Sequence, residues 1–175
     1  MDMLSQPRYP EFDLTEMING EEIMGPSPFL YHQQIVSNLY LYLRLYVDAQ
    51  GLGKVYISPL DVIFEEKVNV LQPDVLFIKK ENLAIGRDWI RGVPDLVAEV
   101  VSKGTMVRDT VTKKEIYQKY QVPEYWIIMP DMEAVEVFVL EQSGYKLFSA
   151  AEMEGLVRSK IVDGFEIDIK KLLQP

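Results

Sequence analysis

Two acidic residues accompany apolar segments of the sequence that are typical of buried β-strands. Glu99 interrupts a run of Leu, Val and Ala within residues 92–102. Asp74 opens a second apolar run within residues 71–80, directly after a proline. An unpaired buried carboxylate costs several kcal/mol or shifts its pKa, so two such groups suggest a shared partner. Adjacent strands lie about 4.8 Å apart, which lets both carboxylates reach one hard cation such as Mg²⁺ or Mn²⁺.

A structural interpretation of these acids stays open beside the metal interpretation. A Pro-Asp pair often begins a strand because it forms a turn, and both Asp74 and Asp95 follow a proline. Glu99 lies four residues after Asp95, on the same face of an extended strand. Glu99 is therefore either a metal ligand or a buried glutamate whose hydrogen bonds are satisfied within the protein.

The segment that follows Glu99 carries Asp109, Lys113 and Tyr117 at four-residue intervals, which places them on one face of a helix. The plain interpretation is an exposed Asp-Lys pair, worth a few tenths of a kcal/mol, above a packing tyrosine. The alternative is that the first turns of this helix stand over the carboxylates. There a lysine orients the attacking water or stabilises the charge that develops on a phosphate.

The one histidine, His32, opens the first long helix. One interpretation is a structural residue at the start of the helix whose hydrogen bond is satisfied. The other is a functional residue that contacts phosphate or acts as a general acid. Glu21 and Glu22 precede this helix and are candidates for a further carboxylate.

The spacing of apolar residues predicts the elements that position these side chains. A helix is expected over 29–50, ended by Gly51, and a second over 107–120, because Pro123 prevents its continuation. Residues 1–20 are expected to be an irregular or helical lead-in, 67–72 a connection and 81–93 a loop. Strands are expected at 21–24, 54–58, 60–66, 74–80, 95–101, 124–129, 134–141 and 145–150, and a last strand and short helix within 164–173.

This order predicts an α/β (α+β) fold in one domain spanning residues 1–175. A central mixed sheet is flanked by helices, and the segment 134–150 adds a hairpin near the C-terminus through the turn at 142–144. The alternating strand 134–141 is expected to expose a sheet edge, which favours a homodimer.

The composition of the chain excludes some classes of function and weighs against others. The chain has 175 residues and no cysteine, which excludes disulfides, thiolate nucleophiles and cysteine-based zinc sites. It shows neither a signal peptide nor a membrane span, so a cytoplasmic protein is expected. The formal net charge of −9 weighs against nucleic acid, because phosphate binding requires Lys and Arg. A local basic strip is compatible with that total, and its candidates are Arg87, Arg91, Lys103, Arg108 and Lys114.

Several of these segments together resemble the Uma-two family of endonucleases, which belongs to the restriction-endonuclease-like PD-(D/E)XK superfamily. The resemblance covers residues 18–141. It rests on NGEEIMGPSP (19–28) followed by His32, QPDVLFI (72–78), VPDLVAEVVS (93–102), the Asp109, Lys113, Tyr117 series and VPEYWII (122–128). It implies a core of helix, three strands, helix and strand, with a metal site at the sheet.

The resemblance also implies roles for individual residues. Asp74 and Glu99 correspond to the two metal-binding acids of the superfamily. The superfamily lysine belongs two residues after the second acid, and this position is Val101 here. Lys113 lies where some related nucleases carry the Gln of a Gln-x-x-x-Tyr motif, so Lys113 and Tyr117 are the implied replacements.

We therefore expect a Mg²⁺- or Mn²⁺-dependent endonuclease that hydrolyses DNA phosphodiester bonds by in-line attack of water. In this hypothesis Asp74 and Glu99 bind the metal, Lys113 positions water, and Tyr117 and His32 support the site. The alternative is a nuclease-like scaffold that binds nucleic acid or a protein without catalysis, which the net charge of −9 and Val101 favour. A third hypothesis is a glycosidase built on two carboxylates. It requires a deep sugar cleft, and no feature of the sequence predicts one.

Overall fold

The structure, a computed structural model, describes residues 14–25 and 27–175. Its elements in chain order are β1 (Thr15–Ile18), β2 (Glu21–Met24), α1 (Leu30–Gln50), β3 (Gly53–Ile57), β4 (Val62–Glu65), β5 (Asn69–Leu71), β6 (Val75–Lys79), the 3₁₀-helix η1 (Lys80–Ile85), β7 (Ile90–Arg91), β8 (Leu96–Val100), the π-helix η2 (Arg108–Lys113), α2 (Lys114–Lys119), β9 (Glu124–Met129), the 3₁₀-helix η3 (Pro130–Met132), β10 (Ala134–Glu141), β11 (Gly144–Glu152), β12 (Leu156–Arg158), β13 (Glu166–Asp168) and α3 (Ile169–Leu172).

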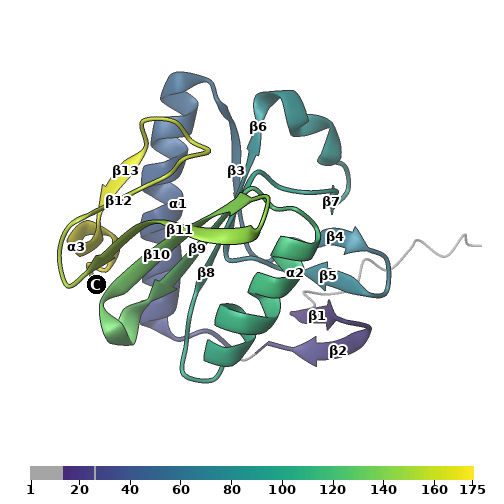
Figure 1. The fold of residues 1–175 in the computed structure, drawn as a ribbon. Helices are drawn as coiled ribbons and strands as arrows, with labels where there is room; N and C mark the ends of the chain where they lie inside the picture. The colour runs from purple at the N-terminus through teal and green to yellow at the C-terminus, as the bar shows by residue number, and fades with distance from the viewer. Residues whose placement is uncertain (1–13, 26) are drawn as a thin grey trace, which may run out of the picture.

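A six-stranded mixed sheet forms the centre of the molecule, in the order β11-β10-β9-β8-β6-β3. Neighbouring strands are antiparallel except β8 and β9, which are parallel. A second, five-stranded sheet has the order β2-β1-β5-β4-β7 and lies beside α2 (Figure 1). The mixed α/β fold expected from the sequence is confirmed, and the smaller sheet is an addition to it.

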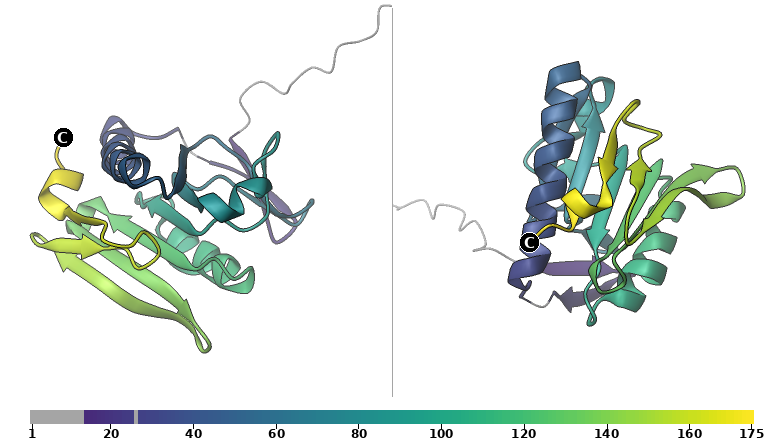
Figure 2. Two further views of the ribbon diagram at one scale, coloured as in Figure 1. Left: turned by 90° about the horizontal axis from the view of Figure 1, so that it is seen from above. Right: turned by 90° about the vertical axis from the view of Figure 1, so that its left-hand side faces the viewer.

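The two faces of the central sheet are covered by different helices (Figures 1 and 2). Helix α1 buries Ile35, Leu39 and Leu43 against one face, at the spacing of an amphipathic helix. It ends at Gly51, whose φ of 64° is the left-handed conformation that glycine adopts without a Cβ penalty. The other face packs against η2 and α2, where Tyr117 is fully buried.

Several sequence-based expectations need correction. The lead-in contains a strand, β1, which forms a hairpin with the expected β2 across a turn with positive φ at Asn19 and Gly20. Its first residues, 1–13, lie outside the described part of the chain. The expected connection 67–72 contains β5, the expected loop 81–93 contains β7, and β12 was not expected. All four strands have two to four residues, too few to display a period-two pattern.

The position of the sheet edge also differs from the prediction. Strand β10 alternates buried and half-buried residues as expected, but it pairs with β9 on one side and β11 on the other. The edge at this end is therefore β11, the second strand of the predicted hairpin. No helix within residues 14–25 and 27–175 is long and apolar enough to cross a membrane.

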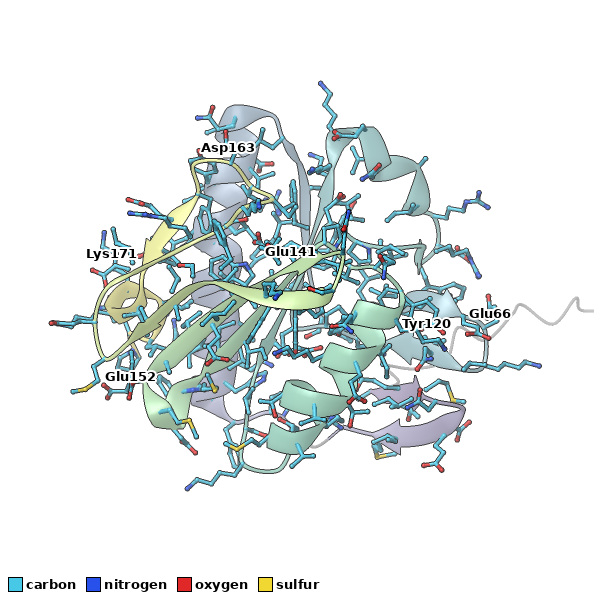
Figure 3. The ribbon with its side chains drawn as sticks, viewed as in Figure 1. Glu66, Tyr120, Glu141, Glu152, Asp163 and Lys171 are labelled. Carbon is cyan, nitrogen blue, oxygen red and sulfur yellow. The ribbon has the colours of Figure 1, made fainter. Side chains whose placement is uncertain are left out.

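Many acidic side chains lie on the outer surface. Glu141, Glu152 and Asp163 are exposed, and Glu152, Asp163 and the exposed Lys171 lie toward the outside of the ribbon (Figure 3). Among the described residues, buried groups nevertheless carry −4 of the formal net charge of −9, because they comprise one cation, Lys113, and five acids, Glu16, Asp95, Glu99, Asp109 and Glu124.

One buried acid, Glu124, has a purely internal set of partners. Its Oε1 accepts hydrogen bonds from Trp126 Nε1 and Ser159 Oγ, both at 2.6 Å. Its Oε2 accepts from the backbone N–H groups of Lys160 at 2.7 Å and Ile161 at 3.0 Å. Burial raises the pKa of Glu124, and these donors oppose that shift. Glu124 therefore fastens the turn after β12 to the start of β9.

Replacing Glu124 by Gln should lower the free energy of unfolding by about 2–3 kcal/mol, because an amide NH₂ then faces donors in a buried site. Urea unfolding followed by circular dichroism measures the loss. Glu115→Gln, an exposed change on α2, is the matched control and should leave the midpoint in place. Equal midpoints for the two variants would contradict the structural role of Glu124.

Candidate functional site

The two acids suggested by the sequence meet in space. Asp74 immediately precedes β6, and the register that pairs Val75 with Ala98 places Asp74 opposite Glu99 when continued by one residue. Opposite residues of an antiparallel pair point to the same face, with Cβ atoms about 4.5–5.5 Å apart. Both residues line one cavity of ≈ 280 Å³.

Glu99 is tolerated in the apolar strand β8 because two donors meet its carboxylate. Lys113 Nζ lies 2.9 Å from Glu99 Oε1, and the Tyr117 hydroxyl donates to the same oxygen at 2.6 Å. Glu99 is only 3% exposed, and burial raises its pKa while the charge of Lys113 opposes the rise. Burial and Glu99 also raise the pKa of Tyr117, so that the hydroxyl keeps its proton.

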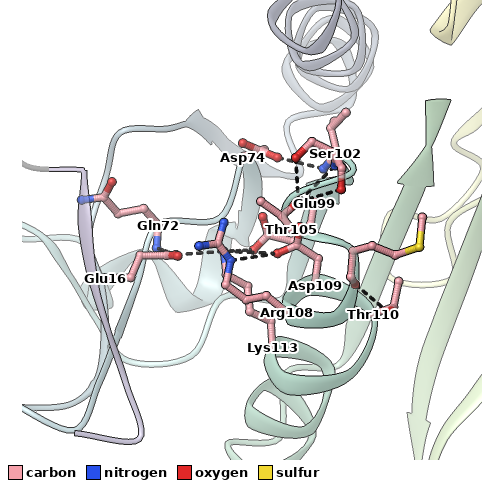
Figure 4. A network of polar contacts seen from close by, with 12 residues as sticks. Glu16, Gln72, Asp74, Glu99, Ser102, Thr105, Arg108, Asp109, Thr110 and Lys113 are labelled. Carbon is pink, nitrogen blue, oxygen red and sulfur yellow. Dashed lines mark hydrogen bonds and ion pairs between the residues drawn. The ribbon is translucent and has the colours of Figure 1, made fainter. Parts of the chain in front are cut away.

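Lys113 is a buried ammonium surrounded by carboxylates (Figure 4). Its Nζ lies 2.8 Å from Glu16 Oε1, 2.9 Å from Glu99 Oε1 and 3.9 Å from Asp109 Oδ1. Burial lowers the pKa of Lys113, but the three negative charges outweigh it and raise the pKa above its ordinary value. The interpretation of Asp109 and Lys113 as an exposed surface pair is wrong, because each is 3% exposed.

The helix that carries these residues begins as a π-helix, η2. In a π-helix the hydrogen bonds run from i to i+5, so a four-residue step completes slightly less than one turn. Asp109 and Lys113 are the buried residues of η2, and Tyr117 continues their side of the helix in α2. Single π turns occur frequently at functional sites, and this one turns Asp109 and Lys113 toward the sheet.

Asp74 is held from both sides by the protein. Its Oδ2 accepts a hydrogen bond from the Val100 backbone N–H at 2.8 Å, and His32 Nε2 lies 3.3 Å from the same oxygen. Burial lowers the pKa of His32, whereas its hydrogen bond and ion pair with Asp74 raise it, and the net change is upward. His32 thus lies in the cavity, as a neighbour of the first acid rather than of Glu99.

Glu16 of β1 was missed by the sequence reasoning. Its Oε1 accepts the backbone N–H of Gln72 at 2.8 Å and also contacts Lys113. The candidates named instead, Glu21 and Glu22, are exposed on β2. The one available signal was the alternation of Glu16 with Ile18, both buried on the same face of β1.

Two further residues considered from the sequence, Asp95 and Val101, lie outside the cavity. Asp95 accepts hydrogen bonds from the Lys79 backbone N–H and from Asn82 Nδ2, each at 2.8 Å, so it is a structural acid with partners distant in the sequence. Val101 lies on the sheet face that carries Glu99, but it packs in the apolar cluster with Tyr117 and does not line the cavity.

The structure separates the five basic residues proposed as a strip. Arg91 is paired with Asp88 and Glu66, and the Lys114 ammonium lies 3.2 Å from the centre of the Phe138 ring. Lys103 is a solvated side chain, 89% exposed. Arg87 is exposed beside β7. Arg108 is the member of this set that lines the cavity.

The donor set of the cavity fits a hard divalent cation. Its acidic residues are Glu16, Asp74, Glu99 and Asp109, against the cations Lys113 and Arg108. Asp109 Oδ1 is buried without a hydrogen-bond partner among the described residues. No group of three His or acidic side chains in the described chain is arranged to hold a metal by itself. Mg²⁺ typically takes only one or two protein carboxylates and completes its shell with water and substrate phosphate.

Comparisons with known proteins give the family of the chain and a solved structure of similar fold. A solved structure described as a "putative nuclease belonging to DUF820" from Anabaena variabilis matches with a TM-score of 0.76. The match covers 91% of this chain and 89% of that one at 21% identity, so it concerns the fold. The model of the Uma2 family, described as "Putative restriction endonuclease", matches residues 4–170. The chain belongs to this family. No match is found among curated proteins.

Replacing Lys113 by Met should lower the free energy of unfolding by about 3–5 kcal/mol, because Glu16 and Glu99 lose their buried counter-charge. Urea unfolding measures the loss. Adding Glu99→Gln to Lys113→Met should recover part of it, because one of the uncompensated carboxylates is removed.

Lys119→Met is the matched control for this test, since Lys119 is exposed and pairs with the exposed Glu65 at 3.8 Å. Its unfolding midpoint should stay close to that of the wild type. A Lys113→Met protein as stable as the control would contradict the paired, buried ammonium described above.

Proposed function

We propose that this protein is a divalent-cation-dependent nuclease that hydrolyses phosphodiester bonds of DNA. One observation carries the proposal: Asp74 and Glu99 line the same cavity, and the protonated side chain of Lys113 is fixed against Glu99 at 2.9 Å. Carboxylates for a hard cation and a fixed positive charge are the groups that phosphodiester hydrolysis requires.

Asp74 and Glu99 are the residues that would hold Mg²⁺ or Mn²⁺. The bound ion supplies neutralisation of phosphate charge and a more acidic water molecule. The hydrogen bond from the Val100 N–H orients the Asp74 carboxylate, and those from Lys113 and Tyr117 orient Glu99. Such supporting contacts fix the ligands before the ion and the substrate arrive.

Lys113 performs the function of the superfamily lysine, whose position in the sequence is occupied here by Val101. Its ammonium stays charged because three carboxylates surround it, and it lines the cavity that the phosphate enters. A fixed positive charge at this place favours the added negative charge of the transition state when water attacks. His32 orients Asp74 through the 3.3 Å contact.

The comparisons support the nuclease proposal at the level of the family. The Uma2 family is described as "Putative restriction endonuclease", and the solved relative as a "putative nuclease". A scaffold that binds without cleaving is the competing function, favoured by the strongly acidic chain, with a net charge of −9.

Asp74→Asn and Glu99→Gln should each reduce DNA hydrolysis in Mg²⁺ or Mn²⁺ at least about 100-fold, because each removes a charged oxygen ligand. The measurement is the rate of cleavage of labelled single-stranded and duplex DNA, with EDTA as the metal-free reference. Glu21→Gln, an exposed change on β2, is the matched control and should retain the wild-type rate.

Thermal unfolding separates metal binding from catalysis in the same proteins. A metal ion whose free concentration is 100 times its dissociation constant stabilises the native state by about 2.7 kcal/mol. Asp74→Asn should lose this stabilisation. Metal stabilisation without hydrolysis of either DNA form would identify a scaffold. An equal metal response in the wild type and Asp74→Asn would remove Asp74 from the metal site.

A further inference from the structure

The cavity has a largely apolar rim and a charged floor. Its exposed lining residues include the polar Ser27 and Gln33 and the apolar Leu14, Pro28, Phe29 and Pro59. The Phe29 side chain is 76% exposed. Glu16, Glu99, Asp109 and Lys113 lie buried among the sheets and η2, and Asp74 is half-buried. An exposed aromatic ring above a charged floor matches the two chemical halves of a nucleotide, a flat base and a phosphate.

Two residues that line this cavity, Arg108 and His32, each carry a buried nitrogen without a hydrogen-bond partner among the described residues, Nε and Nδ1 respectively. Arg108 Nε lies 3.7 Å from Asp109 Oδ1, an ion-pair distance too long for a hydrogen bond. The ammonium of Lys113, in contrast, is already bound by two carboxylates. The Nε atom of Arg108 is itself buried, so an entering phosphate meets Arg108 through the exposed part of its side chain, which is 20% exposed and whose guanidinium suits phosphate oxygens.

The surroundings are poorly suited to a long duplex. Duplex binding neutralises several phosphates at once with a track of Lys and Arg. Arg91 is paired with acids, Lys114 packs on Phe138, and neither lines the cavity. The cavity volume of ≈ 280 Å³ lies just below the usual range of ligand pockets, about 300–1,000 Å³. Its size is that of one small group rather than of a double helix.

We infer that the cavity accepts one unpaired nucleotide, so that the substrate of the proposed nuclease is single-stranded DNA. The base stacks on Phe29 at the rim, and the phosphate is contacted by Arg108 and lies between Asp74 and Lys113 on the floor. This inference rests on the proposed function for the cleavage step, whereas the binding preference can be measured without cleavage.

The test is fluorescence anisotropy of the full chain with a labelled DNA strand, alone or annealed to its complement, in EDTA and in Ca²⁺. The single strand should bind at least about tenfold more tightly than the duplex. Phe29→Ala should weaken single-strand binding about tenfold by removing one stacked base. Leu30→Ala, on an adjacent side chain that is 88% exposed and does not line the cavity, is the matched control.

Salt dependence tests the phosphate contact separately. For a single strand, each phosphate contact contributes about 0.7 to the slope of log K against log salt. Arg108→Gln should lower the slope by about that amount and weaken binding about tenfold, while Arg108→Lys should keep the slope. Lys103→Gln removes a solvated cation outside the cavity and should change neither value.

The outcomes separate this inference from the proposed function. Tighter binding of the duplex, or unchanged binding by folded Phe29→Ala and Arg108→Gln proteins, overturns the single-strand inference even when metal-dependent cleavage is present. Preferential single-strand binding that depends on Phe29 and Arg108, without cleavage in any metal, supports the inference and contradicts the nuclease. Urea midpoints of the variants confirm that each is folded.

Discussion

The site depends on one buried ammonium group that must keep its charge inside the protein. Lys113 Nζ lies within 3 Å of both Glu16 and Glu99, at 2.8 and 2.9 Å. A buried ion is strongly destabilising when its partner is removed, so no member of this trio is dispensable alone. The three residues come from β1, β8 and η2. The ion pairs therefore connect the small sheet, the central sheet and the helix above it.

Stability alone does not account for this arrangement. Well-packed apolar side chains of similar volume often stabilise a protein as much as a buried ion pair does, or more. The cavity also holds Asp74 and Asp109, whose charges exceed what Lys113 neutralises. A surplus of fixed carboxylates is unfavourable in an isolated core but useful to a site that receives a cation. The π turn of η2 is likewise a departure from regular geometry, and it occurs where the buried charged residues Asp109 and Lys113 lie.

The sequence could predict the parts of the site that lie in long, strongly patterned segments. Glu99 stands out against the apolar β8, and Asp74 occupies the matching place before β6, so the pair could be found from local pattern. Glu16 could not, since β1 has four residues and a strand of that length displays too few positions to reveal its faces. The burial of Lys113 was also hidden, because four-residue spacing describes an exposed helix face and a buried one equally well.

Net charge was the strongest sequence argument against a nucleic-acid substrate, and the structure shows its limited reach. Exposed acids such as Glu141, Glu152 and Asp163 are in contact with solvent, where salt screens charges over about 8 Å. The potential in the cavity is set instead by the groups that line it, in a less polar medium where charges interact more strongly. There the carboxylates repel a phosphate unless positive charge is added. Arg108 supplies part of that charge, and in the proposed nuclease a bound cation would supply the rest, which would couple metal and phosphate binding at this site.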